Sequence, residues 1–254
     1  MNPFLATAHQ LADLARPIAK RYFRAHTHDL GAVDKADLSP VTLADQAIEA
    51  AIRAHLRQTH PHHGIIGEEA GRENDSAAYQ WVIDPIDGTK SFMAGKPQFG
   101  TLVALLHHGQ PMLGLIDQAI LNERWWGLDG QAFFNHQPLS SSGARHLSEA
   151  IVFTTTPDMW TDKAVLARLQ TQCKRIVYGG DCYNYAMLAM GHIDAVVELD
   201  LKPHDFLCLP PIIEAAGGKI VDWSGNALHL GSDGRVIAVA EPKLLPELLA
   251  CLHG

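Results

Sequence analysis

Two aspartates separated by two residues are the side chains best placed to do chemistry in this sequence. Asp84 and Asp87 stand in the run 81–89 (WVIDPIDGT), whose first three residues are apolar and predict a buried strand. Pro85 fixes φ, so we expect it to turn the chain out of the strand and bring the two carboxylates together. Paired carboxylates suit a hard divalent cation, which prefers oxygen ligands.

The residues that follow Asp87 predict a binding site for an anion. Gly88 allows a close approach of the backbone, and Thr89 begins a short helix that we expect to extend to Ala94. Backbone N–H groups at the start of a helix attract phosphate, whereas bare carboxylates repel it. A divalent cation between them removes that conflict, and Mg²⁺ is the usual one with phosphate substrates. An isolated D-x-x-D-G run is otherwise a common polar turn, so the metal hypothesis needs further acids.

Further acids stand in two other segments of the chain. Glu68 and Glu69 follow the apolar run 64–67 (GIIG), and Asp205 precedes an apolar stretch that predicts a helix over 206–216. Taken alone, Asp205 fits a helix N-cap or a first-turn charge better than a metal ligand, and Glu68 fits a solvated surface acid. A metal centre requires that these acids meet the aspartates of the 81–89 run.

Taken together, these segments resemble the inositol monophosphatase superfamily of Mg²⁺-dependent, lithium-sensitive phosphatases. The resemblance rests on residues 67–69 (GEE), residues 84–89 (DPIDGT) and Asp205 ahead of the glycine pair 217–218, in that order over nearly the whole chain. It implies an α/β fold with layered α+β character, an alternating α-β-α-β-α sandwich of the inositol monophosphatase and fructose-bisphosphatase type. It also implies hydrolysis of a phosphomonoester with two or three Mg²⁺ ions and without a covalent intermediate.

The resemblance implies a role for each residue of the site. The metal ligands would be Glu68, Asp84, the carbonyl of Ile86, Asp87 and Asp205. The catalytic group would be Asp45, Thr89 and Glu68, in which Asp45 and Thr89 orient the attacking water and accept its proton. The substrate would contact Asp87, Gly88, Thr89, Lys90, Asp181, Glu198 and Asp205. Lys35 would lie near the phosphate on a mobile loop.

The substrate side departs from the inositol-type pattern. The run 90–92 (KSF) replaces the more usual Thr/Asn-Phe, and His204 stands where such members usually carry Trp. Asp181 and Glu198 add two acids beyond the metal ligands, which favours a cationic alcohol over a neutral polyol. The combination of DGTKSF, GDCYNY and LKPHDF resembles the histidinol-phosphate phosphatase branch. That branch implies hydrolysis of L-histidinol phosphate to L-histidinol and phosphate in histidine biosynthesis.

Several alternatives stay open at the level of the sequence. Asp181 also fits the N-cap of a predicted helix over 182–190, and Glu198 has an inositol-contacting counterpart in other members. An inositol-1-monophosphatase, or a broad-specificity sugar or nucleotide phosphatase, would carry the same metal residues. The nucleotide branch typically has Lys-Glu-Phe where this chain has Ser91 in the middle. A non-catalytic relative that binds a phosphorylated ligand would have a broken metal set, and here the set is complete.

The elements that position these residues fall into two parts. We expect helices over 4–22 and 42–58, with Pro17 kinking the first or ending it early, and a loop over 26–40. The predicted strands of the first part are 64–67, 81–83, 100–106, 112–116 and 124–127. After a linker over 138–143, the predicted strands are 151–154, 175–178, 195–198, 219–221 and 236–240, and the helices 162–171, 182–190, 206–216 and 243–252. We expect one phosphatase domain over 1–254, with a metal and phosphate lobe over 1–138 and a substrate-side lobe over 144–254.

The composition argues against several classes of partner. The chain has 254 residues with 20 Lys and Arg against 28 Asp and Glu, a net charge of −8, which disfavours nucleic acid and a membrane surface. Its four cysteines lack a regular spacing, and no signal peptide or spanning segment is expected, so we predict a cytoplasmic protein. His60, His62 and His63 fit solvated loop residues better than a zinc site. The partners expected are a small phosphorylated substrate and, from the resemblance, a second copy in a homodimer.

Overall fold

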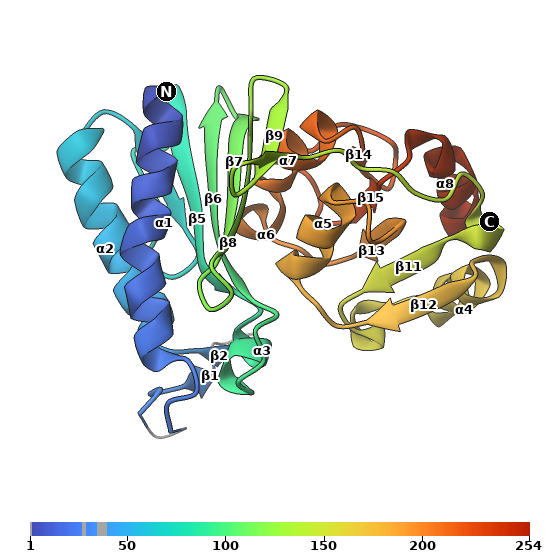
Figure 1. Ribbon diagram of the computed structural model, residues 1–254, viewed down its shortest axis with the longest axis horizontal. Coiled ribbons are helices and arrows are strands. Elements are labelled where there is room, and N and C mark those ends of the chain that lie inside the picture. The colour runs from blue at the N-terminus through green and yellow to red at the C-terminus, as the bar shows by residue number, and fades with distance from the viewer. Residues whose placement is uncertain (1, 27–28, 35–39) are drawn as a thin grey trace.

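Two large β-sheets, one in each half of the sequence, organise residues 2–26, 29–34 and 40–254, which the computed structural model describes (Figure 1). Helices cover the outer face of each sheet and fill the space between the sheets, so the layers alternate helix, sheet, helix, sheet, helix. Three hydrophobic clusters hold these layers together, one under each outer helical layer and one around the central helices. This arrangement confirms the predicted α/β sandwich.

The first sheet has eight strands, and it carries most of the predicted metal ligands. The strands are β3 (Gly64–Gly67), β4 (Gly71–Glu73), β5 (Tyr79–Asp87), β6 (Gly100–His107), β7 (Gln110–Gln118), β8 (Glu123–Leu128), β9 (Gln131–Phe134) and β10 (Gln137–Pro138). Their order in the sheet is β10-β9-β8-β7-β6-β5-β3-β4. Pro138 belongs to β10, so the predicted linker begins one residue later than expected.

The pairing of β3 with β5 explains how distant acids come together. The two strands are parallel, and Gly67 lies opposite Ile83. Glu68 follows Gly67 directly and its N–H donates to the Ile83 carbonyl at 3.2 Å, while Asp84 follows Ile83. Both acids therefore leave the same edge of the sheet side by side.

The end of β5 differs from the sequence prediction. Pro85 does not turn the chain out of the strand, because β5 continues to Asp87 and its pairing with β6 shifts in register between Asp84 and Asp87. Thr101 on β6 donates its hydroxyl to the Pro85 carbonyl at 2.8 Å. An irregular pairing tolerates proline because no ladder N–H is required there, and it lets the two aspartates converge.

Two long helices, α1 (Pro3–Tyr22) and α2 (Leu43–Thr59), cover the outer face of this sheet (Figure 1). The predicted early end of the first helix at Pro17 is wrong. Pro17 lies on the solvent side of α1, where water can satisfy the carbonyl left without a partner, while Ala15 and Ala19 are fully buried. The predicted loop before α2 contains a short antiparallel pair, β1 (Val33–Asp34) with β2 (Pro40–Val41).

The second half alternates strands and helices, as predicted. A five-stranded sheet in the order β12-β11-β13-β15-β14 consists of β11 (Ile151–Thr154), β12 (Arg175–Tyr178), β13 (Ala195–Glu198), β14 (Lys219–Asp222) and β15 (Val236–Val239). The helices are α4 (Lys163–Gln172), α5 (Cys182–Ala189), α6 (Pro203–Phe206), α7 (Leu209–Ala215) and α8 (Leu245–His253). Short 3-10 turns occupy Leu147–Glu149, Pro157–Met159 and Pro242–Leu244. In the part of the chain that the structure describes, no helix combines the length and apolar character needed to cross a membrane.

The predicted helix over 206–216 is two helices, α6 and α7. Pro210 and Pro211 stand in the first turn of α7, where a missing N–H costs nothing, so a new helix begins there. The backbone of this segment lies directly on the first sheet. A Cβ on Gly114 of β7 would overlap the Cys208 carbonyl, and one on Gly127 of β8 would overlap the Pro211 carbonyl. This contact fixes α6, and with it Asp205, above β5.

Candidate metal centre and active site

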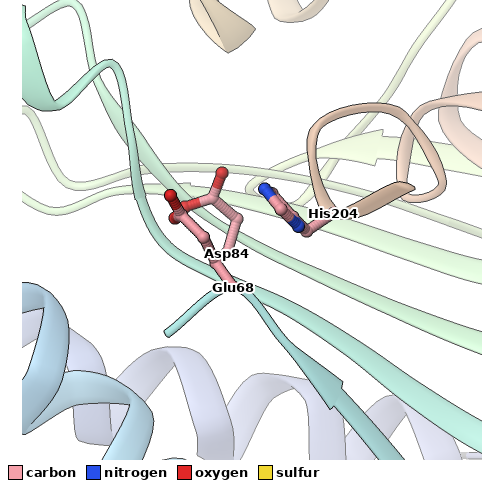
Figure 2. A group of neighbouring side chains, drawn as sticks. All are labelled: Glu68, Asp84 and His204. Carbon is pink, nitrogen blue, oxygen red and sulfur yellow. The ribbon is translucent and has the colours of Figure 1, made fainter. Parts of the chain in front are cut away.

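Four carboxylates from three segments meet at the edge of the first sheet. Oxygen atoms of Asp84, Asp87 and Asp205 lie within 4.8 Å of one another, and so do ligand atoms of Glu68, Asp84 and His204 (Figure 2). Asp84 belongs to both groups, so the two groups share one centre. We call Glu68, Asp84, Asp87 and Asp205 the carboxylate centre.

Backbone N–H groups hold two of these carboxylates in place. The N–H of Lys202 donates to Oδ2 of Asp205 at 2.6 Å, so Asp205 also has the first-turn role that the sequence left open. The N–H of Cys182, at the start of α5, donates to Oδ2 of Asp87 at 2.6 Å. The carboxylate centre is therefore tied to the central helices as well as to the sheet.

The electrostatics of the centre call for a cation. Asp84 is 2% exposed, and its Oδ1 has no hydrogen-bond partner among the described residues. Burial raises the pKa of Asp84 well above its ordinary value, and the neighbouring acids raise it further. Burial also raises the pKa of Asp87 and of Asp205. A divalent cation would satisfy the unpaired oxygen and the excess negative charge together, so this donor set fits a metal ion.

Asp45, a predicted catalytic residue, lies at the start of α2 and is 1% exposed. Thr42 donates its N–H and its hydroxyl to Oδ2 of Asp45, at 2.8 and 2.6 Å, whereas Oδ1 has no partner in the described part of the chain. Burial raises the pKa of Asp45 to about 6, although the Thr42 hydrogen bonds oppose the shift. A buried carboxylate with one open oxygen and a pKa near neutrality is suited to accept a proton.

The predicted phosphate cradle lies between β5 and α3 (Thr89–Met93). Gly88 has φ +84, a left-handed conformation that favours glycine, and a Cβ there would lie 2.8 Å from the Gln98 carbonyl. The Thr89 hydroxyl donates to the carbonyl of Ile86 at 3.0 Å. Among the described contacts, no direct hydrogen bond joins Thr89 to Asp45. Lys35 lies outside the described residues.

A small cavity of about 70 Å³ places the predicted substrate acids beside the carboxylate centre. It is lined by Asp87, Thr155, Met159, Asp181, Cys182, Tyr185, Glu198, Leu201 and Asp205. Burial raises the pKa of Asp181, although the hydrogen bond from Ser91 and the positive charge of Lys90, which is exposed on α3, oppose the shift. Helices α5 and α6, one strand of each sheet and the 3-10 turn at Met159 thus contribute to one pocket.

Asp181 does not act as a side-chain N-cap of α5. Its backbone occupies the N-cap position with φ 44, but its side chain makes no cap hydrogen bond and instead accepts from the Ser91 hydroxyl at 3.2 Å. Asp87 satisfies the first N–H of α5 in its place. The Asp181 carboxylate is therefore directed to the side of the cavity that faces α3.

Glu198, at the end of β13, is 2% exposed and accepts three hydrogen bonds. The donors are the Tyr185 hydroxyl at 2.8 Å and the N–H and hydroxyl of Thr155 at 3.0 and 2.5 Å. Burial nevertheless raises the pKa of Glu198 to about 7. Sequence reasoning missed Tyr185 and Thr155; the GDCYNY run contains Tyr185, but no signal marked Thr155.

Comparison with known proteins relates this chain to one family. The model of the inositol monophosphatase family matches residues 1–253. The chain is 48% identical to Bifunctional phosphatase IMPL2, chloroplastic, of Arabidopsis thaliana over 94% of this chain and 70% of that protein. It is 33% identical to the histidinol-phosphatase of Mycobacterium tuberculosis over 98% of each chain. A solved inositol monophosphatase from Zymomonas mobilis is 41% identical, with a TM-score of 0.88 over 98% of this chain and 97% of that one.

The family match over nearly the whole chain, the shared fold and the acidic groups able to bind a metal agree with one another. The chain therefore belongs to the inositol monophosphatase family, whose members are metal-dependent phosphatases.

Proposed function

We propose that this phosphatase hydrolyses L-histidinol phosphate to L-histidinol and phosphate, with Mg²⁺ at the carboxylate centre. The observation that carries the choice of alcohol is the cavity in which Asp181 and Glu198 stand beside Asp87 and Asp205. The relative from Mycobacterium tuberculosis, a histidinol-phosphatase, supports the same substrate.

The charge of the cavity favours a cationic alcohol. Histidinol carries an ammonium group and an imidazole, whereas inositol is neutral and needs hydroxyl partners only. Asp181 and Glu198 offer carboxylates on the substrate side of the metal ligands. The pKa of Glu198, which burial raises to about 7, would fall again beside a bound ammonium, because an opposite charge favours the ionised carboxylate. Binding of the cation would thus be coupled to release of a proton.

The residues of the chain have distinct parts in the proposed reaction. Mg²⁺ would supply charge neutralisation at the phosphoryl group and at the leaving alkoxide, and would lower the pKa of the attacking water. Asp45 would accept a proton through its unpaired Oδ1, and Thr89 would help to orient the water. The backbone at Gly88 and Thr89 would hold phosphoryl oxygens, with no step that needs a Ser or Cys nucleophile.

A substrate panel tests the proposal directly. Histidinol phosphate, inositol 1-phosphate, fructose 1,6-bisphosphate and adenosine 3′,5′-bisphosphate would be assayed with Mg²⁺, and we expect the highest kcat/KM for histidinol phosphate. Inositol 1-phosphate is the second candidate, because a solved relative with a TM-score of 0.88 is an inositol monophosphatase. A preference of about tenfold or more for inositol 1-phosphate would overturn the choice of substrate.

The role of Asp181 can be tested with one isosteric variant. We expect Asp181→Asn to lower kcat/KM for histidinol phosphate about tenfold more than for inositol 1-phosphate, because only the first loses a counter-charge. Asp129→Asn, a change of the same type at an exposed turn, is the matched control. Equal losses on both esters would contradict the counter-charge argument.

The cytoplasmic location and the homodimer are also proposals. Light scattering of the purified protein would measure the mass in solution, and a mass equal to one chain at working concentration would exclude the homodimer.

A further inference from the structure

We propose that His204 is a ligand of the metal ion held by Glu68 and Asp84, and that its nitrogen shifts this position from Mg²⁺ toward a divalent transition ion. The inference rests on the proposed metal binding at the carboxylate centre and deepens it. It concerns a residue that the family pattern did not predict as a ligand, since Trp is usual at this position in inositol-type members.

The geometry brings three ligand atoms to one point. A carboxylate oxygen of Glu68, one of Asp84 and a ring nitrogen of His204 all lie within 4.8 Å of one another. Figure 2 shows the two carboxylates together at the end of the sheet and the imidazole ring pointing toward Asp84 from α6. A single ion placed between them would therefore reach all three side chains.

A second observation indicates that something positive belongs there. The Oδ1 atom of Asp84 is buried without a hydrogen-bond partner among the described residues, and a lone buried carboxylate oxygen is costly. The His204 ring is not held strongly by its own helix, because its Nε2 lies 3.5 Å from Oδ1 of Asp205, too far for a strong hydrogen bond. The ring is 18% exposed and is carried by α6, whose backbone is fixed on the first sheet.

The chemistry of the donor set distinguishes this position from the rest of the centre. Asp84, Asp87 and Asp205 offer oxygen only, the set that Mg²⁺ prefers. Two carboxylates and an imidazole form a mixed oxygen and nitrogen set, which divalent transition ions accept more readily than Mg²⁺ does. The centre would therefore hold two positions of different selectivity, with His204 as the residue that makes the difference.

Pulsed EPR of the full chain loaded with Mn²⁺ tests nitrogen ligation without an activity assay. We expect the wild-type protein to show the nitrogen modulation of a directly bound imidazole. That modulation should change when histidine is labelled with ¹⁵N, and it should disappear in His204→Gln. His136→Gln, which removes an exposed histidine, is the matched control and should keep the wild-type spectrum. If the variant fails to fold, the labelled wild-type protein still shows whether a histidine binds the ion, and His204 is the histidine grouped with the carboxylates among the described residues.

Calorimetry provides the second measurement. We expect His204→Gln to weaken Mn²⁺ binding about tenfold or more and Mg²⁺ binding much less, because only the first ion gains from the nitrogen. Equal losses for the two ions, or bound Mn²⁺ without nitrogen modulation in the wild-type protein, would overturn the role of His204. The proposed function would survive either result. It would fail instead if the wild-type protein bound neither ion and hydrolysed no ester with Mg²⁺.

Discussion

Asp84 and Asp117 are two buried aspartates on strands β5 and β7 of the same sheet, 2% and 1% exposed. Asp117 lies between two guanidinium groups: Arg16 donates to it at 2.6 and 3.0 Å, and Arg124 at 2.6 Å. Asp84 has acidic neighbours and one oxygen, Oδ1, without a hydrogen-bond partner in the described part of the chain. Among the described residues, two arginines neutralise Asp117, whereas the neighbours that shift the pKa of Asp84 are themselves acidic.

The comparison distinguishes a carboxylate whose burial supports the fold from a carboxylate whose burial prepares a binding site. A buried carboxylate with its cations already in place contributes to the fold and has nothing left to bind. One that is buried among other carboxylates opposes folding until a cation arrives, which is typical of a functional site. Substitutions at Asp84 and Asp117 should therefore have opposite consequences for activity and for stability.

The largest effect is expected for Asp84→Asn. Turnover should fall by about a thousandfold or more, because Asn cannot supply the charge shared by both metal groups. The free energy of unfolding of the metal-free variant should equal or exceed that of the wild-type protein, since repulsion among the acids is relieved. Steady-state assays and thermal unfolding with and without Mg²⁺ measure both. At a Mg²⁺ concentration of about 100 times the Kd, the free energy of unfolding of the wild-type protein should rise by about 2.7 kcal/mol. That of the variant should not rise. Near-normal turnover of a folded variant would remove Asp84 from the mechanism.

Asp117→Asn should reverse this pattern. Removing one partner of a buried ion pair costs about 3–5 kcal/mol, and we expect the lower end because Arg124 keeps its contact with Asp13 at 2.7 Å. Turnover per folded molecule and the stabilisation by Mg²⁺ should stay at wild-type levels. Urea unfolding measures the loss, with Asp13→Asn as the control: Asp13 is 66% exposed, so its loss should cost under about 1 kcal/mol. A stable but inactive Asp117→Asn would refute the structural assignment.

The smallest effect is expected at Glu198, which is buried and accepts from Thr155 and Tyr185, with no cationic hydrogen-bond partner among the described residues. Its pKa rises from 4.5 to about 7 on burial, so between these values the folded protein holds a proton that the unfolded chain has released. The metal-free protein should therefore lose stability as pH rises through this range, by at most about 1.4 kcal/mol per pH unit from this group. Glu198→Gln should flatten the profile, and Glu149→Gln, at an exposed site, should not. An unchanged slope in Glu198→Gln measured by urea unfolding would contradict the shift.

The layered fold could be predicted from the sequence, and several local breaks in it could not. Apolar periodicity and turn residues locate the strands and helices because these signals act within a few residues. The effect of Pro17 depends on which side of α1 faces solvent, and the effect of Pro85 depends on the pairing of β5 with β6. Only the assembled sheet and its covering helices determine both. The division of the 206–216 segment likewise depends on how α7 meets β7 and β8.

For the site, the DPIDGT run identified the chemistry, but contacts between distant segments could not be predicted. Arg16 and Asp117 are 101 residues apart, and Thr155 and Glu198 are 43 apart, so no local pattern joins them. The histidines predicted to be solvated are partly packed: His63 stacks on Tyr79, its Nδ1 accepts from the Trp81 indole N–H at 3.1 Å, and its ring lies 4.6 Å from that of His60. Metal and substrate roles of the predicted residues stay predictions until the variants above are measured.

Gly114 and Gly127 have a consequence for how such an enzyme can acquire new substrates. Because they let the α6–α7 backbone rest on the sheet, and because one hydrophobic cluster joins both sheets around the central helices, the distance between the halves is set by packing. A mutation cannot widen the pocket by moving the layers without opening that core. Evolution, or a protein engineer, must instead exchange the side chains that line the pocket, such as Met159 and Leu201, while the catalytic framework stays unaltered.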